Sequence, residues 1–290
     1  MPSSRAAPPL DAYVLHSYDW SESSLIVDLF TRSQGRVVVV AKGAKRPTSN
    51  FRPLLLPFHA LTVWHSRAAA DAQGEVWNLR AVEWGGGAPL PGPVLISGFY
   101  LNELLLKGLA RQDPHPTLFD AYADTLAALA AVRVTTETRR DAERDTDRDS
   151  DRTTERTEER DTGNDPEAEA VALRAFELVL LRELGLLPEL DTLTASAAAL
   201  VPTLRYTLRP EAGMAIDSEG ATGTTWVALQ AALLHGSLAA LRQACAADPH
   251  ALRAPLRNLV HYHLATPQLR TRRVSQQMQR LLNSPGRPLR

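Results

Sequence analysis

Alternation of apolar and polar residues predicts β-strands up to the glycine run that begins at Gly85. In Leu25–Phe30 successive side chains alternate between two faces, and the turn Arg32–Gly35 leads directly into the apolar run Arg36–Ala41, so these two strands should form a hairpin. The other predicted strands are Tyr13–Tyr18, Ala60–Trp64 and Glu75–Val82. Five short strands with a loop after the third suit a small closed β-barrel of OB type.

Helical periodicity replaces this alternation after a Gly/Pro-rich segment that ends at Pro93. The strongest pattern is Glu167–Leu187, which has a wide apolar face and stop signals at Gly185 and Pro188. The other predicted helices are Leu95–Leu109, Leu118–Val132, Trp226–His235, Leu238–Ala246 and Ala251–Leu264, and a small hairpin is predicted for Tyr206–Leu208 with Met214–Ile216. The predicted class is α+β: an OB-type barrel in residues 1–84, a linker in 85–93 and an α-helical bundle domain in 94–290.

A charged repeat interrupts the helical part of the chain. Between residues 140 and 163 an arginine recurs at every fourth position, from Arg140 to Arg160, among Asp, Glu and Thr. The repeat holds no large apolar residue and cannot bury a core, so we expect disorder at about residues 134–166. It is either an expanded loop, tolerated because loop-closure entropy grows slowly with length, or a charged interaction segment.

Composition limits the possible classes. The chain has 290 residues, 44% of them hydrophobic, and a single cysteine, Cys245, which excludes internal disulfides and a cysteine-based zinc site. No signal-peptide pattern and no stretch of about 20 apolar residues is present, so we expect a soluble cytoplasmic protein. The formal net charge of −1 averages an acidic repeat and basic segments that are well separated.

The largest of these basic segments lies in the barrel half. From Thr31 to Arg67 the chain has seven Lys or Arg residues and no Asp or Glu. A basic loop that leaves a strand can neutralise phosphates without reading sequence, and an OB barrel adds aromatic faces on which bases stack. The predicted DNA-binding residues are Arg36, Lys42, Lys45, Arg46 and Arg52. The alternative is a protein-interaction scaffold whose basic loop meets an acidic partner.

The C-terminal region is a second candidate. From Ala251 to Arg290 there are eight arginines and no acid, and Arg270, Arg272 and Arg273 are possible further phosphate contacts. Walker, nucleophile-elbow, zincin and dinucleotide-binding signatures are missing, so we interpret the chain as a binder without catalytic residues. A nuclease that uses scattered carboxylates is the third possibility.

Several ordered motifs resemble the RecO family of DNA-repair mediators. They are Ala12–Ser17, Ser21–Leu25, Asp28–Thr31, Gly35–Arg36, Ala41–Lys45, Pro57–Phe58, Ser97–Leu104, Leu173–Leu178 and Leu184–Gly185. The resemblance covers most of the chain and is loose over the last hundred residues. It implies an OB fold and a helical domain, binding of single- and double-stranded DNA, strand annealing, and a cytoplasmic, nucleoid-associated location. It also implies partnership with RecR and the single-strand-binding protein SSB, and through them the loading of RecA.

The resemblance carries one predicted partner site and one departure. In the family the acidic, Phe-ended tail of SSB binds near the Leu-Arg-x-Phe-Glu helix, which implies Arg174, with Leu178 and Leu181 as an apolar floor; plain core is the alternative for both leucines. Many members hold zinc through four cysteines. With Cys245 alone we expect no zinc and no other cofactor, and packing must hold the region after Pro188.

Overall fold

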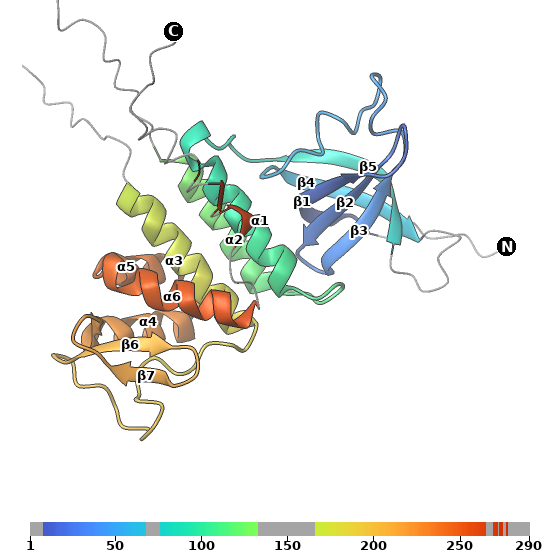
Figure 1. Ribbon diagram of the computed structural model, residues 1–290. Coiled ribbons are helices and arrows are strands. Elements are labelled where there is room, and N and C mark those ends of the chain that lie inside the picture. The colour runs from blue at the N-terminus through green and yellow to red at the C-terminus, as the bar shows by residue number, and fades with distance from the viewer. Residues whose placement is uncertain are drawn as a thin grey trace, which may run out of the picture.

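A five-stranded closed barrel forms the N-terminal domain of the computed structural model (Figure 1). The strands are β1 (Leu10–Asp19), β2 (Leu25–Thr31), β3 (Gly35–Ala41), β4 (Ala60–Arg67) and β5 (Val76–Gly86). Their order is β1-β2-β3-β5-β4, with β3 and β5 parallel and the other pairs antiparallel. This confirms the predicted OB-type barrel. The structure describes residues 8–67, 76–132 and 166–264, with 269–271, 273, 274 and 277.

The predicted hairpin is the β2–β3 pair, and its turn also meets the helical domain. Gly35 has a φ of +64°, a left-handed conformation that favours glycine. A Cβ atom there would lie 1.9 Å from the carbonyl oxygen of Asp113, so only glycine lets the two backbones approach. Inward side chains of both strands, such as Val27 and Val39, are fully buried in the barrel core. The turn therefore fixes the strand pairing and brings the helical domain against the barrel.

The helical domain begins with α1 (Leu95–Gly108) and α2 (Pro116–Ala130), which pack against the barrel. These two helices follow the 3-10 turn η1 (Gly92–Val94) and precede α3 (Pro166–Glu183). The segment predicted as a charged, disordered repeat at about 134–166 lies outside the described residues, except for Pro166, where α3 begins. Helix α3 ends four residues before the predicted Leu187. Gly185 has a φ of +68° there, and Leu186 N–H donates to the carbonyl oxygen of Leu181, which closes the helix.

A small sheet and three further helices complete the domain. They are β6 (Arg205–Arg209), β7 (Gly213–Ile216), β8 (Ala221–Thr222), α4 (Gly223–His235), α5 (Leu238–Ala246) and α6 (Pro249–His263). The predicted hairpin is the β6–β7 pair. Each helix starts at a side-chain cap: Thr222, Ser237 and Asp248 accept a hydrogen bond from the backbone N–H three residues further on.

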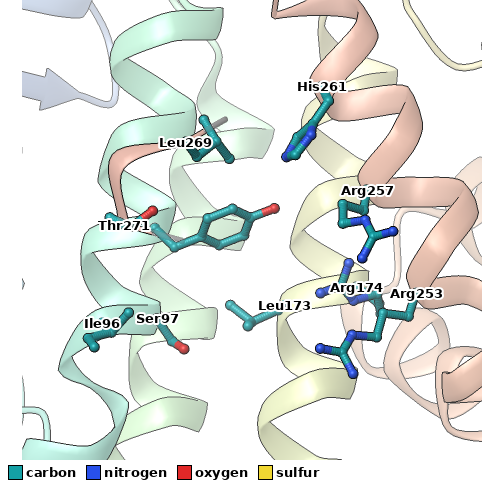
Figure 2. Close-up of a pocket in the computed structure, with 10 residues that line it drawn as sticks. Ile96, Ser97, Leu173, Arg174, Arg253, Arg257, His261, Leu269 and Thr271 are labelled. Carbon is teal, nitrogen blue, oxygen red and sulfur yellow. The ribbon is translucent and has the colours of Figure 1, made fainter. Parts of the chain in front are cut away.

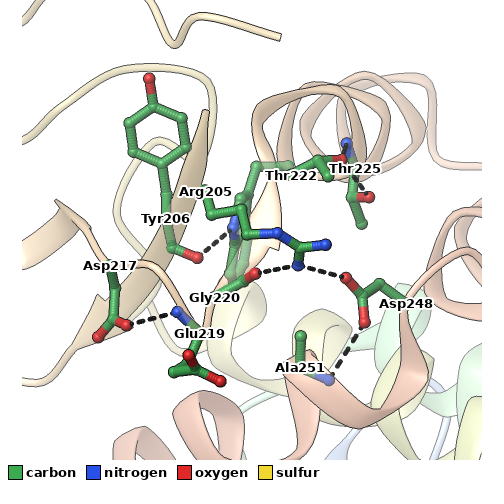
Figure 3. A network of polar contacts seen from close by, with 10 residues as sticks. Arg205, Tyr206, Asp217, Glu219, Gly220, Thr222, Thr225, Asp248 and Ala251 are labelled. Atoms are coloured by element: carbon green, nitrogen blue, oxygen red, sulfur yellow. Dashed lines mark hydrogen bonds and ion pairs between the residues drawn. The ribbon is translucent and has the colours of Figure 1, made fainter. Parts of the chain in front are cut away.

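Polar contacts tie this sheet to the helices (Figure 3). The indole N–H of the fully buried Trp226 donates to the carbonyl oxygen of Tyr206 at 2.9 Å. The guanidinium of Arg205 donates to the carbonyl oxygen of Gly220 at 2.8 Å and lies 3.6 Å from the capping carboxylate of Asp248. Strand β6 is thus attached to the first turns of both α4 and α6.

One apolar core runs from the barrel into the helices. Helix α3 lies among α2, α5 and α6, and its Phe176 is fully buried. From the barrel, Tyr13 and Phe30 join the same cluster, with the Tyr13 ring 5.3 Å from Phe119 and 5.0 Å from Tyr122. The two domains are therefore packed against each other as one body rather than joined only by the linker.

Buried polar groups fix this junction. The side-chain amide of Asn102 on α1 donates to the carbonyl oxygens of Leu15, at 2.9 Å, and Val14, at 3.4 Å, where β1 changes register. The hydroxyl of Tyr122 on α2 donates to the amide oxygen of Asn102 at 2.5 Å. Burial raises the pKa of Tyr122, which keeps the phenol a donor. Three elements therefore meet at one fully hydrogen-bonded amide.

Replacing Asn102 with Ala should reveal the cost of losing this junction. The change leaves the Leu15 carbonyl and the Tyr122 hydroxyl buried without a partner, so we expect the free energy of unfolding to fall by about 3 kcal/mol. Leu234→Ala is the control, because Leu234 is 65% exposed and its loss should cost less than about 0.5 kcal/mol. Urea unfolding followed by circular dichroism measures both. Equal costs for the two variants would contradict this account of the junction.

Candidate nucleic-acid groove and arginine pocket

A basic groove lies on the barrel between the loop after β3 and strand β5. It encloses about 430 Å³, and its cations are Lys42, Arg46 and Arg80. Consecutive turns shape the loop: Ala44 N–H donates to the Ala41 carbonyl and Arg46 N–H to the Gly43 carbonyl. The other described residues that line it are small, polar or apolar, and none of them is acidic. The groove is therefore suited to a polyanion. We call it the basic groove.

Arg80 is a groove residue that sequence reasoning missed. It is exposed on β5 beside the buried Leu79, and its Nε donates to the hydroxyl of Ser66 on β4 at 2.7 Å. Strand alternation predicts an outward side chain at this position. Only the parallel pairing of β3 with β5, which closes the barrel, places that side chain beside the loop.

The structure distributes the predicted DNA-binding residues unevenly. Lys42 and Arg46 are exposed and line the basic groove. Lys45 instead lies against the end of β1, where its Nζ donates to the Ser21 carbonyl at 3.1 Å and pairs with Asp19 at 3.3 Å. Arg52 is exposed but does not line the groove. The basic groove thus contains two of the five predicted residues, together with Arg80.

Arg36 occupies a structural position that conflicts with its predicted role in DNA binding. Its Nη1 donates to the carbonyl oxygens of Leu106 and Leu109 at 2.5 and 3.1 Å, and its Nε pairs with the carboxylate of the buried Asp28 at 3.3 Å. The last carbonyls of a helix have no intrahelical partner, and here a cation from the barrel satisfies them. Arg36 therefore joins β3 to the C-terminal end of α1 and is not available to phosphate.

A second cavity, the arginine pocket, lies between α1, α3 and α6 and encloses about 250 Å³ (Figure 2). Arg174 of α3 and Arg253 and Arg257 of α6 gather at one side, with His261 further along α6. Ile96, Tyr100, Leu173 and Leu269 supply apolar surface. Cations beside an apolar wall suit a ligand that carries both a carboxylate and an apolar group.

A buried carboxylate orients Arg174. Glu177, one turn along α3, is fully buried, pairs with the Arg174 guanidinium and accepts a hydrogen bond from the Tyr100 hydroxyl at 2.6 Å. Burial raises the pKa of Glu177, while Arg174 and Tyr100 oppose the shift. With Arg253 and Arg257 also present, the pocket keeps an excess of positive charge when Glu177 is ionised.

The predicted floor of Leu178 and Leu181 is wrong. Their side chains are 0% and 1% exposed and belong to the main core, so no ligand can reach them. The reason is that α3 is covered by α2, α5 and α6, and both leucines face that cover rather than the pocket. Leu173, the residue before Arg174, lines the pocket instead.

The C-terminal arginines lie beside a short segment that is attached to α1. The carboxylate of Glu103 accepts hydrogen bonds from the backbone N–H groups of Arg270 and Thr271 at 2.8 and 3.0 Å, and from the Thr271 hydroxyl at 2.7 Å. Burial alone would raise the pKa of Glu103, but these bonds and the charge of Lys107 together lower it. Arg270 and Arg273 are exposed; Arg272 lies outside the described residues.

Other chemistries have little support in the described part of the chain. Its His, Cys, Asp and Glu residues form no group of three or more that could hold a metal ion. Cys245 is buried, and burial raises the pKa of its thiol to about 12. Among the residues that the structure describes, no helix is long and apolar enough to cross a membrane.

An OB-type barrel with a basic groove, packed on a helical domain with a cationic pocket, defines a class of two-domain proteins whose surface suits anionic ligands. Comparison narrows this class. The family model described as "Recombination protein O N terminal" matches residues 9–71. The DNA repair protein RecO of Polaromonas naphthalenivorans is 45% identical over 276 residues, covering 93% of this chain and 96% of that protein. Those of Acidovorax ebreus and Delftia acidovorans are 44% and 40% identical, covering 93% and 97% of this chain and 96% and 100% of the relatives. The chain belongs to the RecO family.

Arg36→Gln should separate the structural arginine from those in the basic groove. The change leaves Asp28 buried without its ion pair, so we expect the free energy of unfolding to fall by about 3–5 kcal/mol. Arg52→Gln, on an exposed residue of the same segment, should cost less than about 0.5 kcal/mol. Denaturant titration of the two variants provides the measurement. A stable Arg36→Gln protein would show that this arginine is not required for the junction.

Proposed function

We propose that this chain, within the DNA repair and recombination role of its family, binds single- and double-stranded DNA through the basic groove. The observation that carries the proposal is the meeting of Lys42, Arg46 and Arg80 in a groove whose described lining contains no acidic residue. Phosphates are common to both forms of DNA, so these cations supply affinity without sequence preference. Binding alone suffices for this role, and no bond needs to be made or broken. The chain therefore acts as a mediator rather than an enzyme, and without a cofactor.

Annealing follows from the same charge. Two complementary strands repel each other through their phosphates, and a cationic surface that holds one strand lowers this repulsion for the second. Strand pairing then proceeds by base pairing itself. The protein needs only to concentrate and neutralise the strands.

The arginine pocket supports a second part of the proposal, capture of the acidic C-terminal tail of SSB. A terminal carboxylate would pair with Arg174, whose guanidinium Glu177 holds in place, and Arg253 and Arg257 would attract the acidic residues. The ring of a terminal phenylalanine would pack on Leu173, Ile96 and Leu269. The floor differs from the one predicted from sequence, while the cation is the same.

The remaining partners rest on the family alone. RecR would act together with this chain, and RecA would be loaded onto the single strands from which SSB has been drawn aside. These events place the protein at the nucleoid in the cytoplasm.

The basic groove can be tested through the salt dependence of DNA binding. Lys42→Ala with Arg46→Ala removes two phosphate contacts, so the slope of log K against log salt for single-stranded DNA should fall by about 1.4. Arg80→Ala alone should lower it by about 0.7. Arg182→Ala with Arg209→Ala is the charge-matched control, since both residues are exposed and outside the groove. Fluorescence anisotropy at several salt concentrations gives the slopes.

An unchanged slope in the groove variant would remove DNA from the basic groove. If the wild-type protein binds an acidic peptide and no DNA, the groove belongs to a protein-interaction scaffold. Incubation of DNA with the protein and Mg²⁺ should leave the DNA intact; cleavage would contradict the non-enzymatic role.

Arg174→Glu should abolish binding of a peptide with the acidic, Phe-ended sequence of an SSB tail, because it places a like charge beside the peptide carboxylate. DNA affinity should persist, since Arg174 lies on α3 and the basic groove on the barrel. Calorimetry with the peptide measures the first effect and anisotropy the second. Arg182→Glu, an exposed arginine of the same helix outside the pocket, is the matched control. Wild-type peptide affinity in Arg174→Glu would exclude the arginine pocket as the tail site.

A further inference from the structure

A row of exposed rings follows β1. His16 and Tyr18 are two residues apart in the strand and so lie on the same face, and Trp20 follows two residues later, just after the strand. The ring centroids of His16 and Tyr18 are 4.4 Å apart in an edge-to-face arrangement, which confirms their common side. Tyr18 is 47% exposed and Trp20, directly after the strand, is 65% exposed. Such surface has no structural use, because the barrel core is already filled from the other face of β1.

The row ends in a groove between the barrel and the helical domain, which we call the junction groove. It encloses about 460 Å³ between β1, α1 and the C-terminal segment, and both His16 and Tyr18 line it. Across it stands Phe99 of α1, 45% exposed, with its ring 5.0 Å from the buried Phe58. In Figure 1, α1 lies on the barrel side of the helical domain, which agrees with this position.

Positive charge borders the junction-groove end of the row. At the junction groove the charged lining residues are Glu103, Lys107 and Arg270. The carboxylate of Glu103 accepts hydrogen bonds from the backbone N–H groups of Arg270 and Thr271 and lies 3.6 Å from the Nζ of Lys107. One negative charge thus faces the two positive charges of Lys107 and Arg270, so the rim keeps an excess of positive charge. At the other end, Lys45 binds the Ser21 carbonyl next to Trp20 and neutralises Asp19.

Lys45 belongs to the same loop as Lys42 and Arg46 of the basic groove. The aromatic row therefore starts at the basic loop and leads to the junction groove. Exposed rings that lead into a groove with cations on its rim form an arrangement that suits unpaired strands, in which bases stack and phosphates are neutralised.

We propose that the row and the junction groove form a path for single-stranded nucleic acid, with bases stacked on Tyr18, Trp20 and Phe99 and the backbone led past Lys107 and Arg270. This inference rests on the proposed DNA-binding function and assigns its single-strand specificity. In a duplex the bases are stacked on one another and cannot lie on these rings. The basic groove thus serves both forms of DNA, and the row serves the single strand alone.

The test compares two probes, a fluorescein-labelled oligothymidylate and a fluorescein-labelled duplex, by anisotropy at several salt concentrations. Tyr18→Ala with Trp20→Ala should weaken oligothymidylate binding by at least about fivefold. The salt slope should stay unchanged, since no phosphate contact is lost, and duplex affinity should equal that of the wild type. Tyr18→Phe with Trp20→Phe keeps the rings and should restore single-strand affinity.

Trp84→Ala is the matched control, because Trp84 is a barrel tryptophan with 62% exposure that lies on β5 and does not line the junction groove. It should bind both probes as the wild type does. Wild-type affinity for oligothymidylate in Tyr18→Ala with Trp20→Ala would overturn the proposal, as would an equal loss on the duplex or in Trp84→Ala. Unchanged DNA binding with lost affinity for an acidic peptide would assign the row to a protein partner instead.

DNA binding by the basic groove and the single-strand path along the row can be disproved separately. If the wild-type protein binds neither probe, the proposed function itself is wrong. If binding depends on Lys42 and Arg46 and not on the rings, the basic groove stands and the single-strand path does not.

Discussion

The hydrogen-bonded amide of Asn102 is the constraint on which the arrangement of both domains depends. It joins α1 to β1 where the pairing of β1 with β2 changes register, and its amide oxygen accepts a hydrogen bond from the Tyr122 hydroxyl of α2. A buried amide with all its partners present tolerates little displacement, since moving it leaves carbonyl and hydroxyl groups unpaired. These hydrogen bonds hold α1 against β1 beside the junction groove, which Asn102 also lines.

Arginine is used in three ways in this molecule, and the difference lies in what surrounds each side chain. Arg36 is consumed by a buried carboxylate and the last carbonyls of α1. Arg174 shares its charge with the buried Glu177 and still borders a pocket. Arg80 donates a hydrogen bond to the neutral hydroxyl of Ser66, a contact that leaves its positive charge uncompensated. Only the last two settings leave a cation that an anionic ligand can use.

The sequence predicted more of the fold than of the sites. Alternation found the five strands and periodicity found the helices, because both signals are local along the chain. The failures involve contacts distant in sequence. Arg36 meets carbonyls of α1 about 70 residues away, Arg80 reaches the loop only through barrel closure, and Leu178 is covered by helices that follow it. A wide apolar helix face indicates burial, but it does not say which of its leucines the neighbouring helices leave accessible.

The resemblance to a family pointed to Arg174, which lines the arginine pocket, and misplaced its floor for the same reason. A motif specifies which side chains share a helix. The pocket is completed by α6 and the C-terminal segment, where the resemblance is loose. Arg253, Arg257 and Leu269 therefore could not be found from the motif. The sequence shows that the C-terminal region is rich in arginine and free of acids, but it does not show that this region faces α3.

The C-terminal segment around Thr271 gives the arginine pocket and the junction groove a common wall. Ile96 and Thr271 line both the arginine pocket and the junction groove, and Glu103 fixes Thr271 through its backbone N–H and its hydroxyl. On the proposed function, an acidic tail would lie on one side of this wall and a single strand on the other. The cation on this wall, Arg270, would offset part of the repulsion between the two anionic ligands. The same molecule can then hold the tail of a strand-coating protein while it receives the strand that this protein leaves.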